Sequence, residues 1–488
     1  MSAILCHTNI SDVVSKYPPK PVRNLTLTPG KFLVSLTWED PEDYTEEGYI
    51  CTWAKTVVVR KTGGYPNDIH DGTVVVTTVE RDKYKTSGYD DTGLTGGETY
   101  YYRVFTCSTD GVYGEPAEGT AVPVQYRIMT VTINLDNSNP ATCGSYADDA
   151  VTMESGKSES ATNVWQKFFG YRPCLFKDGK VVGYLNPNDF TKFEDGSDAD
   201  ITSGDAGDVM IQFPRRGVRI SKSENIVTVS MTDDPNDSSF KYYAHQRGSV
   251  DKDYFYLGAY DGYVTGHKLR SLSGKSPSMS ISLASFDTYG KANGTGYGCL
   301  GYYQWLFLQV MYVLQFKGNL DSQTTVGTGY VDYDRKANTG RSNSNGMIYG
   351  DNNVAKLFGI EDIWGNAVQV VNNYYSNSSY HITTTTDDTI TDTSKYTDHG
   401  SYGARILNDG YAENCIGNTE VGFTAPYGSY SGSSSTYFCD YARFTKTYVP
   451  FVGGDFTDSD LAGIFFFSLS YGRNDDFLKH EGSRLGYL

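Results

Sequence analysis

A cluster of large polar and aromatic side chains lies close to the C-terminus, between two apolar segments. It reads YGRNDDFLKHEG and begins at Tyr471. Aromatic rings and charged groups of this kind bury surface area and still form hydrogen bonds, so together they have the chemistry of a binding surface. An ordinary solvated loop is the alternative interpretation. The candidate contact residues are Tyr471, Arg473, Asn474, Asp475, Asp476 and Phe477.

Two further loops shortly before this cluster offer the same combination of aromatic anchors and charges. Their candidate contact residues are Tyr441, Arg443 and Phe444 in one loop, and Asp455, Phe456, Asp458 and Asp460 in the other. The chain contains 41 tyrosines and 52 glycines. Such a composition is typical of adaptable binding surfaces, because tyrosine supplies contact area and glycine lets loops adjust. It also favours short strands and long turns over helices.

The apolar segments on either side of the C-terminal cluster must hold it in place. Residues 463–470 are aromatic, apolar and free of proline, which predicts a strand, and residues 483–488 predict the last strand. Phe465, Phe467 and Leu469 share one strand phase, which we expect to be buried. The loop residues expected to be largely exposed are Tyr471, Arg473, Asn474 and Asp475.

The first 125 residues contain short runs of alternating apolar and polar side chains, separated by glycine, proline or aspartate turns. After a lead-in at residues 1–18, Trp38 ends the run VSLTW, and the later segment LTGGETYYYRV spans residues 94–104. With these motifs, residues 19–125 resemble a fibronectin type III domain, an all-β sandwich whose core includes the tryptophan. The resemblance implies a spacer, in which Trp38 should be buried.

Residues 126–488 form the second predicted domain, in which a few helical segments lie among strands and long loops. The candidate helices are residues 163–169, 280–291 and 301–316. Residues 300–316 are the most apolar segment, but they are slightly short for a membrane span and carry three glutamines. They predict a buried helix in an α+β domain and no membrane insertion.

Charge and cysteine content exclude several classes of function. The formal net charge of −17 on 488 residues disfavours nucleic acid as a partner, because phosphates repel an acidic surface. Eight cysteines without a CxxC pair are sparse for this length and predict buried thiols. The opening residues lack the basic start and long apolar run of a signal peptide, which predicts synthesis in the cytoplasm.

A further motif, LFGIEDIWGNAVQVV at residues 357–371, places Trp364 before a tight Gly-Asn turn between two apolar runs. Together with YFCD at 437–440, VGGDF at 452–456 and GSRL at 482–485, it resembles the C-type-lectin-like fold of the formylglycine-generating-enzyme type. More narrowly, it resembles phage tail proteins of gut bacteria, which include the variable proteins diversified by retroelements. The resemblance covers residues 127–488 and is strongest after residue 280.

This resemblance implies a multidomain adhesin, with an all-β fibronectin III-like sandwich followed by a large α+β C-type-lectin-like domain. In that group the fold is a framework, and side chains near the C-terminus bind a receptor on the host bacterial surface, either a glycan or a protein. The resemblance also implies a virion protein that contacts other phage tail proteins and forms a homo-oligomer, with a trimer expected. It implies neither catalysis nor a cofactor.

Three alternatives stay open. The formylglycine-generating fold can carry out oxidative chemistry through a late cysteine pair, but Cys415 and Cys439 lack the spacing of that pair, and the chain has no familiar catalytic or zinc motif. A calcium lectin could use oxygen ligands from residues 233–237 or 455–460, although no complete calcium-loop motif is present. A bacterial surface or secreted lectin-like adhesin is the third alternative.

Overall fold

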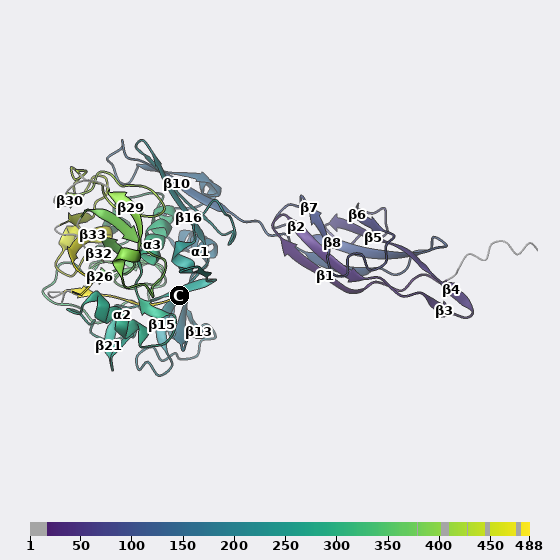
Figure 1. Ribbon diagram of the computed structural model, residues 1–488, viewed down its shortest axis with the longest axis horizontal. Coiled ribbons are helices and arrows are strands. Elements are labelled where there is room, and N and C mark those ends of the chain that lie inside the picture. Colours follow the sequence, from purple (N-terminus) through teal and green to yellow (C-terminus); the bar gives the residue numbers. More distant parts are fainter. Residues whose placement is uncertain (1–16, 378, 402–408, 427, 445–448, 475–479) are drawn as a thin grey trace, which may run out of the picture. The chain divides into compact units, whose positions relative to one another are not determined.

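The computed structural model describes residues 17–377, 379–401, 409–426, 428–444, 449–474 and 480–488 (Figure 1). The chain divides into two compact units, Met1–Tyr126 and Arg127–Leu488. Both units are rich in β-strands, in agreement with the predicted β-rich multidomain class. Residues 1–16 of the predicted lead-in, including Cys6, lie outside the described residues.

The first unit is built from two sheets that share one hydrophobic core. One sheet has the order β1 (Arg23–Gly30), β2 (Leu33–Glu39) and β7 (Tyr89–Thr92). The other has the order β6 (Thr73–Thr78), β5 (Trp53–Thr62), β8 (Tyr100–Ser108) and β9 (Ala117–Ala121), and β3 (Tyr44–Glu46) pairs with β4 (Tyr49–Cys51). Trp38 of β2 is 1% exposed and shares this core with Tyr102 of β8. The predicted burial of Trp38 is confirmed, and residues 17–126 contain no helix.

The second unit contains three larger sheets. The four-stranded sheet has the order β11 (Gly144–Asp148), β10 (Ile128–Asn134), β17 (Ile226–Thr232) and β16 (Gly217–Ser223). The seven-stranded sheet has the order β14 (Asp189–Phe193), β13 (Lys180–Asn186), β12 (Arg172–Lys177), β15 (Asp208–Pro214), β20 (Tyr254–Gly258), β35 (Leu485–Tyr487) and β23 (Tyr297–Cys299). The six-stranded sheet has the order β30 (Gly410–Tyr411), β31 (Tyr441–Phe444), β33 (Gly463–Tyr471), β32 (Val449–Gly453), β26 (Val368–Val370) and β34 (Glu481–Gly482).

Shorter elements complete the second unit. A three-stranded sheet contains β27 (Tyr374–Ser376), β28 (His381–Thr384) and β29 (Thr397–Ser401), and two-stranded pairs are formed by β18 (Gln246–Arg247) with β19 (Val250–Asp251), β21 (Tyr263–Thr265) with β22 (Lys268–Arg270), and β24 (Tyr349–Gly350) with β25 (Ala355–Lys356). The helices are α1 (Glu159–Phe169), α2 (Leu283–Lys291), α3 (Tyr302–Gln315) and α4 (Ser322–Thr325), with 3-10 turns η1 (Asp149–Thr152), η2 (Tyr243–His245), η3 (Thr393–Lys395) and η4 (Ser459–Leu461). The three predicted helices are present. Helix α1 begins before its predicted start because Ser158 caps it, accepting a hydrogen bond from the N–H of Ala161 at 3.0 Å.

Helix α3 lies inside the second unit and packs on β10 and β17 of the four-stranded sheet; Figure 1 shows it among the strands of this unit. It is buried, as predicted. The side-chain amide N–H groups of its glutamines donate to backbone carbonyls of neighbouring segments: Gln304 to Ala244 at 3.0 Å, Gln309 to Ile464 at 2.9 Å and Gln315 to Gly156 at 3.0 Å. These bonds explain how polar residues fit a buried helix. Within the described residues, no helix is both long and apolar enough to cross a membrane.

The chain ends inside its seven-stranded sheet. Strand β35 lies between β20 and β23, with Gly486 opposite Leu257 on one side and Gly298 on the other. Leu485 is fully buried. The last residues of the chain therefore complete the core of the second unit.

Candidate ligand-binding site

Strand β33 is the central support of the predicted loops. It lies between β31, to which it is parallel, and β32, to which it is antiparallel. Phe465 and Phe467 are each 7% exposed, and Tyr312 of α3 packs against Phe465 with ring centroids 5.8 Å apart. The expected burial of Phe465, Phe467 and Leu469 is confirmed. Phe466, on the opposite face, is also buried and belongs to a second core cluster, so the strand is covered on both faces.

Two of the three predicted loops meet at a cavity of about 120 Å³ beside this strand. The lining residues are Val368, Arg443, Phe451, Asp455, Asp458, Phe466, Ser468 and Glu481. Arg443 comes from β31, the two aspartates follow β32, and Glu481 belongs to β34, directly after the third predicted loop. Three carboxyl groups and one guanidinium therefore share a small, partly apolar cavity. This arrangement suits a ligand that donates hydrogen bonds from hydroxyl or amino groups.

Hydrogen bonds fix the loop that carries the two aspartates. The N–H of Asp455 donates to Asp458 Oδ2 at 2.8 Å, and Thr457 donates to Asp455 Oδ1 from its N–H and its hydroxyl, both at 2.7 Å. His480 Nδ1 lies 3.1 Å from Asp455 Oδ2. Phe456 is buried, and its ring packs on the His480 imidazole at 4.4 Å. The loop after β32 is thus tied to the residue that precedes β34.

Burial changes the acidity of one cavity residue. It raises the pKa of Asp458 to about 6, and the neighbouring Asp455 carboxylate adds to the shift, whereas Arg443 and His480 oppose it. A carboxyl group with such a pKa changes its charge over roughly one pH unit on either side of that value. The charge of the cavity therefore changes close to neutral pH.

The other described residues of these two loops lie beside the cavity. Tyr441 is half-buried and packs edge-on against Tyr411 at 5.3 Å, and the hydroxyl of Tyr411 donates to the exposed Asp460 at 3.3 Å. Arg443 Nε lies 3.9 Å from Asp409 Oδ2. Nothing in the sequence around Asp409 and Tyr411 marks them as site residues, because only the pairing of β30 with β31 brings them near the other loops.

The third loop differs from its prediction at Arg473. The guanidinium of Arg473 pairs with Asp287 at 2.8 Å, where the two side chains are 12% and 5% exposed, and it also donates to Asn372. The carbonyl of Arg473 accepts a hydrogen bond from the N–H of Ala284 in α2 at 3.1 Å. The expectation of a largely exposed Arg473 is therefore wrong, since the residue anchors the start of the loop. Asn474 is exposed, as predicted. Outside the described part of the structure lie Asp475, Asp476 and Phe477 and the side chains of Phe444 and Tyr471.

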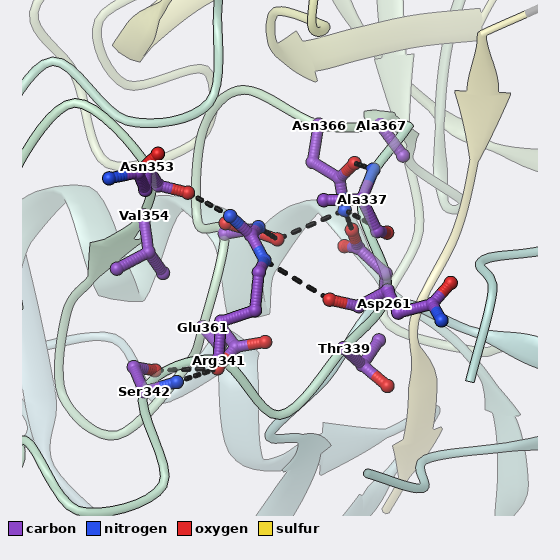
Figure 2. Close-up of polar contacts among 12 residues, drawn as sticks. Asp261, Ala337, Thr339, Arg341, Ser342, Asn353, Val354, Glu361, Asn366 and Ala367 are labelled. Carbon is purple, nitrogen blue, oxygen red and sulfur yellow. Dashed lines mark hydrogen bonds and ion pairs between the residues drawn. The ribbon is translucent and has the colours of Figure 1, made fainter. Parts of the chain in front are cut away.

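Two of the four segments that carry the resemblance, residues 357–371 and 482–485, meet in the interior of the second unit. Arg484 is 1% exposed and donates to the Asp261 carboxylate at 2.7 Å and to the Glu361 carbonyl at 2.6 Å. Arg341 pairs with Asp362 in the same cluster, part of which Figure 2 shows. Burial raises the pKa of Asp261 to about 6 and that of Asp362 to about 8, while the guanidinium groups favour the charged carboxylates. This network fixes the turn at residues 361–366.

The residues behind the alternative functions have structural partners or are buried. Cys415 and Cys439 are buried thiols, and burial raises the pKa of both, that of Cys415 to about 12. This shift is opposite to the one that activates a cysteine. The seven described cysteines are all free and buried, as predicted. Asp233 pairs with Arg127 at 3.0 Å. Among the described residues, no group of three or more His, Cys, Asp or Glu side chains is arranged to hold a metal ion.

Comparison with known proteins does not place the chain in a family. No model of a protein family matches the sequence, and a search of the curated proteins finds no match. Function is therefore argued from the site and from the residues that form it.

Proposed function

We propose that this chain is a receptor-binding protein of a phage tail, which recognises a ligand on the bacterial surface through its second unit. In this proposal the first unit is a fibronectin type III-like spacer, and the second unit is a C-type-lectin-like domain of the formylglycine-generating-enzyme type. The protein works by binding and carries out no catalysis.

One observation carries the proposal. Arg443, Asp455 and Asp458 were chosen from the sequence as contact residues in two separate loops, and all three line the same cavity. Beneath it lies a strand whose side chains are buried on both faces. A rigid framework below converging polar side chains is the arrangement that a binding site needs.

The family resemblance gains support from the contact between its motifs. Arg484 of the GSRL segment and Glu361 of the GIEDIWGN segment are far apart in the chain, yet the guanidinium of the first donates to the backbone of the second. Motifs that contact each other in the structure support the resemblance to this fold more strongly than motifs that lie apart. Membership of the retroelement-diversified proteins rests on the sequence motifs alone.

The proposal includes a homo-oligomer, which we expect to be a trimer, attached to other tail proteins. A shallow site of a few side chains binds weakly, and linked copies raise the overall affinity without any new contact. The location in the virion follows from the same resemblance.

Adsorption to intact bacterial cells tests the proposal. The labelled protein should bind at least one strain in a panel of gut bacteria. Arg443→Ala should weaken this adsorption at least about tenfold, a loss of about 1.4 kcal/mol. Its unfolding midpoint should fall no further than the midpoint of the control variant. The matched control is Arg172→Ala, since the Arg443 and Arg172 side chains are 40% and 42% exposed. Adsorption to no strain, or equal adsorption of the two variants, would contradict the proposal.

A further inference from the structure

A long loop that the sequence analysis did not single out runs beside the candidate site. It connects α4 to β24, and its segment 330–333 lies between the turn at residues 364–366 and the loop that carries Asp455. The N–H of Asn366 donates to the carbonyl of Tyr330 at 2.8 Å, and the N–H of Tyr333 donates to the carbonyl of Phe456 at 2.8 Å. Ser459 N–H donates to the carbonyl of Val331 at 3.0 Å. Backbone bonds on both sides therefore fix this segment next to the candidate site.

Gly365 permits the close approach of this segment. Its φ is +76°, and a Cβ added there would lie only 2.8 Å from the carbonyl oxygen of Tyr330 and 2.9 Å from a side-chain carbon of Val331. A residue with a side chain would displace the segment or strain the turn. The glycine of the GIEDIWGN motif thus has a specific role, which is to hold Tyr330 in position.

Two tyrosine rings of the segment form a tight stack. The rings of Tyr330 and Tyr333 are 3.7 Å apart and inclined by only 3°. The guanidinium of Arg341 lies 4.7 Å from the centre of the Tyr330 ring. Tyr330 therefore contacts both the Tyr333 ring and the Arg341 guanidinium. Arg341 is held in turn by its ion pair with the buried Asp362, so the stack is continuous with the interior network shown in Figure 2.

The outer ring of the stack is fixed and partly open. The hydroxyl of Tyr333 is within hydrogen-bond distance of the carbonyl of Asn352, at 3.1 Å, and of Asn353 Oδ1, at 2.9 Å. The side chain is nevertheless only half-buried. Since Tyr330 stacks on the inner face, a ligand that stacks on the Tyr333 ring must approach from the side away from Tyr330. The flanking side chains Asp332, Asp334 and Arg335 are all exposed.

We propose that the outer face of Tyr333 is a sugar-stacking subsite, which takes one uncharged or amino-substituted pyranose ring of a cell-surface glycan. The inference rests on the proposed function and names the ligand class of the same binding face. One face of a pyranose carries C–H groups that pack on the electron-rich face of an aromatic ring. Its hydroxyls project at the rim, where the carboxylates of Asp332 and Asp334 can accept strong hydrogen bonds and Arg335 can donate them.

Two observations favour a glycan over a protein as the ligand. A protein partner needs a broad contact area with an apolar centre. Among the described residues of the second unit, the large hydrophobic side chains that are most exposed lie elsewhere, at Val151, Val164, Val182, Ile226, Val250 and Tyr254. The exposed carboxylates of Asp332, Asp334 and Asp460 also disfavour acidic sugars, because like charges repel. An uncharged or amino sugar is the class that remains.

Saturation-transfer NMR on the full chain tests the subsite with a defined panel of hexoses, N-acetylhexosamines, hexosamines and uronic acids. We expect signals from at least one non-acidic sugar and none from the uronic acids. Tyr333→Phe keeps the ring and should retain the signal. Tyr333→Ala should weaken binding at least about tenfold, the scale expected when stacking on an aromatic side chain is lost. Tyr254→Ala removes an exposed tyrosine elsewhere in the second unit and should leave binding unchanged.

A second variant tests the subsite if Tyr333→Ala does not fold. If the unfolding midpoint shows that Tyr333→Ala is not folded, the double variant Asp332→Asn, Asp334→Asn removes the charged acceptors and should weaken sugar binding by about threefold or more. The inference is overturned if no sugar binds the wild-type chain, if only acidic sugars bind, or if a folded Tyr333→Ala binds as the wild type does. In each of these cases, adsorption to cells decides separately whether the proposed function stands.

Discussion

Arg473 limits which part of the third loop can meet a ligand. Its guanidinium is bonded to Asp287 and Asn372, and at the other end of the loop His480 contacts Asp455. Both ends are therefore attached to the framework, and the part left for recognition lies between them. In the sequence, Arg473 looks like its neighbours, because nothing local distinguishes an arginine that points to solvent from one that reaches a buried carboxylate.

Replacing Arg473 by alanine should destabilise the second unit. Among the described residues, the change leaves Asp287 with Lys291 as its one charged partner, at 2.8 Å. Loss of one member of a largely buried ion pair costs several kcal/mol, and the remaining lysine reduces this to about 2–3 kcal/mol. Urea denaturation should show this loss, whereas the control Asn474→Ala should stay within about 0.5 kcal/mol of the wild type. Equal stability of the two variants would contradict the anchoring role.

His245 predicts a dependence of stability on pH. The side chain is fully buried between Phe255 and Phe307, with ring centroids at 4.8 Å and 5.3 Å. Burial lowers its pKa to about 3, and the positive charges of Arg215 and Arg216 add to the shift. The unfolded chain binds a proton near pH 6.5 and the folded chain does not, so stability falls as the pH drops from about 6.5 towards 3, by at most about 1.4 kcal/mol per pH unit.

The variant His245→Phe removes the group that takes up this proton. It should lose less stability than the wild type between pH 7 and pH 5, as measured by urea denaturation at each pH. Carboxyl groups with raised pKa values also titrate in this range, so the comparison is the difference between the two proteins. The exposed His267 provides the control, and His267→Phe should follow the wild-type curve. A His245→Phe variant that also follows the wild-type curve would show that the imidazole is protonated while folded.

At the scale of elements, the phase of β33 that contains Phe465, Phe467 and Leu469 is buried, as expected. The opposite face, for which the sequence made no prediction, is buried as well. The run GIFFFSLS is apolar in both phases, so its pattern cannot tell a half-buried strand from one covered on both sides. The difference arises from its neighbours. Helix α3 covers the face of Phe465, while Phe466 packs in the second core cluster.

Single truncations distinguish the two descriptions of β33. Phe467→Ala and Phe466→Ala should each cost roughly 3–5 kcal/mol, because each leaves a cavity in a separate core. A strand with one buried face would instead make one of the two changes mild. Thermal or urea unfolding of both variants measures the costs. A cost below about 1 kcal/mol for Phe466→Ala would show that its face of the sheet is open.

The elements that the sequence predicts correctly are those with a strong local pattern. The apolar run of α3 and the alternation around Trp38 each contain enough local information to fix an element and its burial. The candidate site depends instead on pairing between distant segments. β30 reaches β31 across a long loop, and the ring stack of Tyr330 and Tyr333 sits in a stretch with no periodic pattern. A single sequence carries no signal for such contacts, so it does not point to Asp409, Tyr411 or Tyr333. The local pattern of aromatic and charged residues does point to Arg443 and Asp455, which line the same cavity.

At the scale of the whole molecule, the second unit is closed by the end of its own chain. Strand β35 fills the gap between β20 and β23, and Arg484 just before it reaches Asp261, which lies 223 positions earlier. Strand β35 is therefore part of the core of this unit. The candidate site and the final strand lie on either side of the third predicted loop, whose flanking residues Arg473 and His480 both contact the framework.

The spacer assignment predicts that damage to the first unit leaves recognition intact. Trp38 is 1% exposed, and its indole N–H donates to Asp40 at 3.1 Å. Trp38→Ala should lower the stability of the first unit by roughly 3–5 kcal/mol, because it leaves a large cavity in a small core. Scanning calorimetry should show a shifted transition for this unit only, and binding of a single chain to the receptor should be unchanged.

Light scattering shows how a loss of adsorption by Trp38→Ala is to be interpreted. If adsorption to cells falls together with the molar mass, the first unit holds the oligomer together, and the loss reflects fewer linked sites rather than a weaker site. If adsorption falls while the molar mass stays constant, the first unit itself contacts the cell surface, and its assignment as a spacer is wrong. Phe467→Ala is the control for damage to the second unit. It disturbs the framework below the candidate site, so it should reduce adsorption even if the molar mass shows that the oligomer is intact.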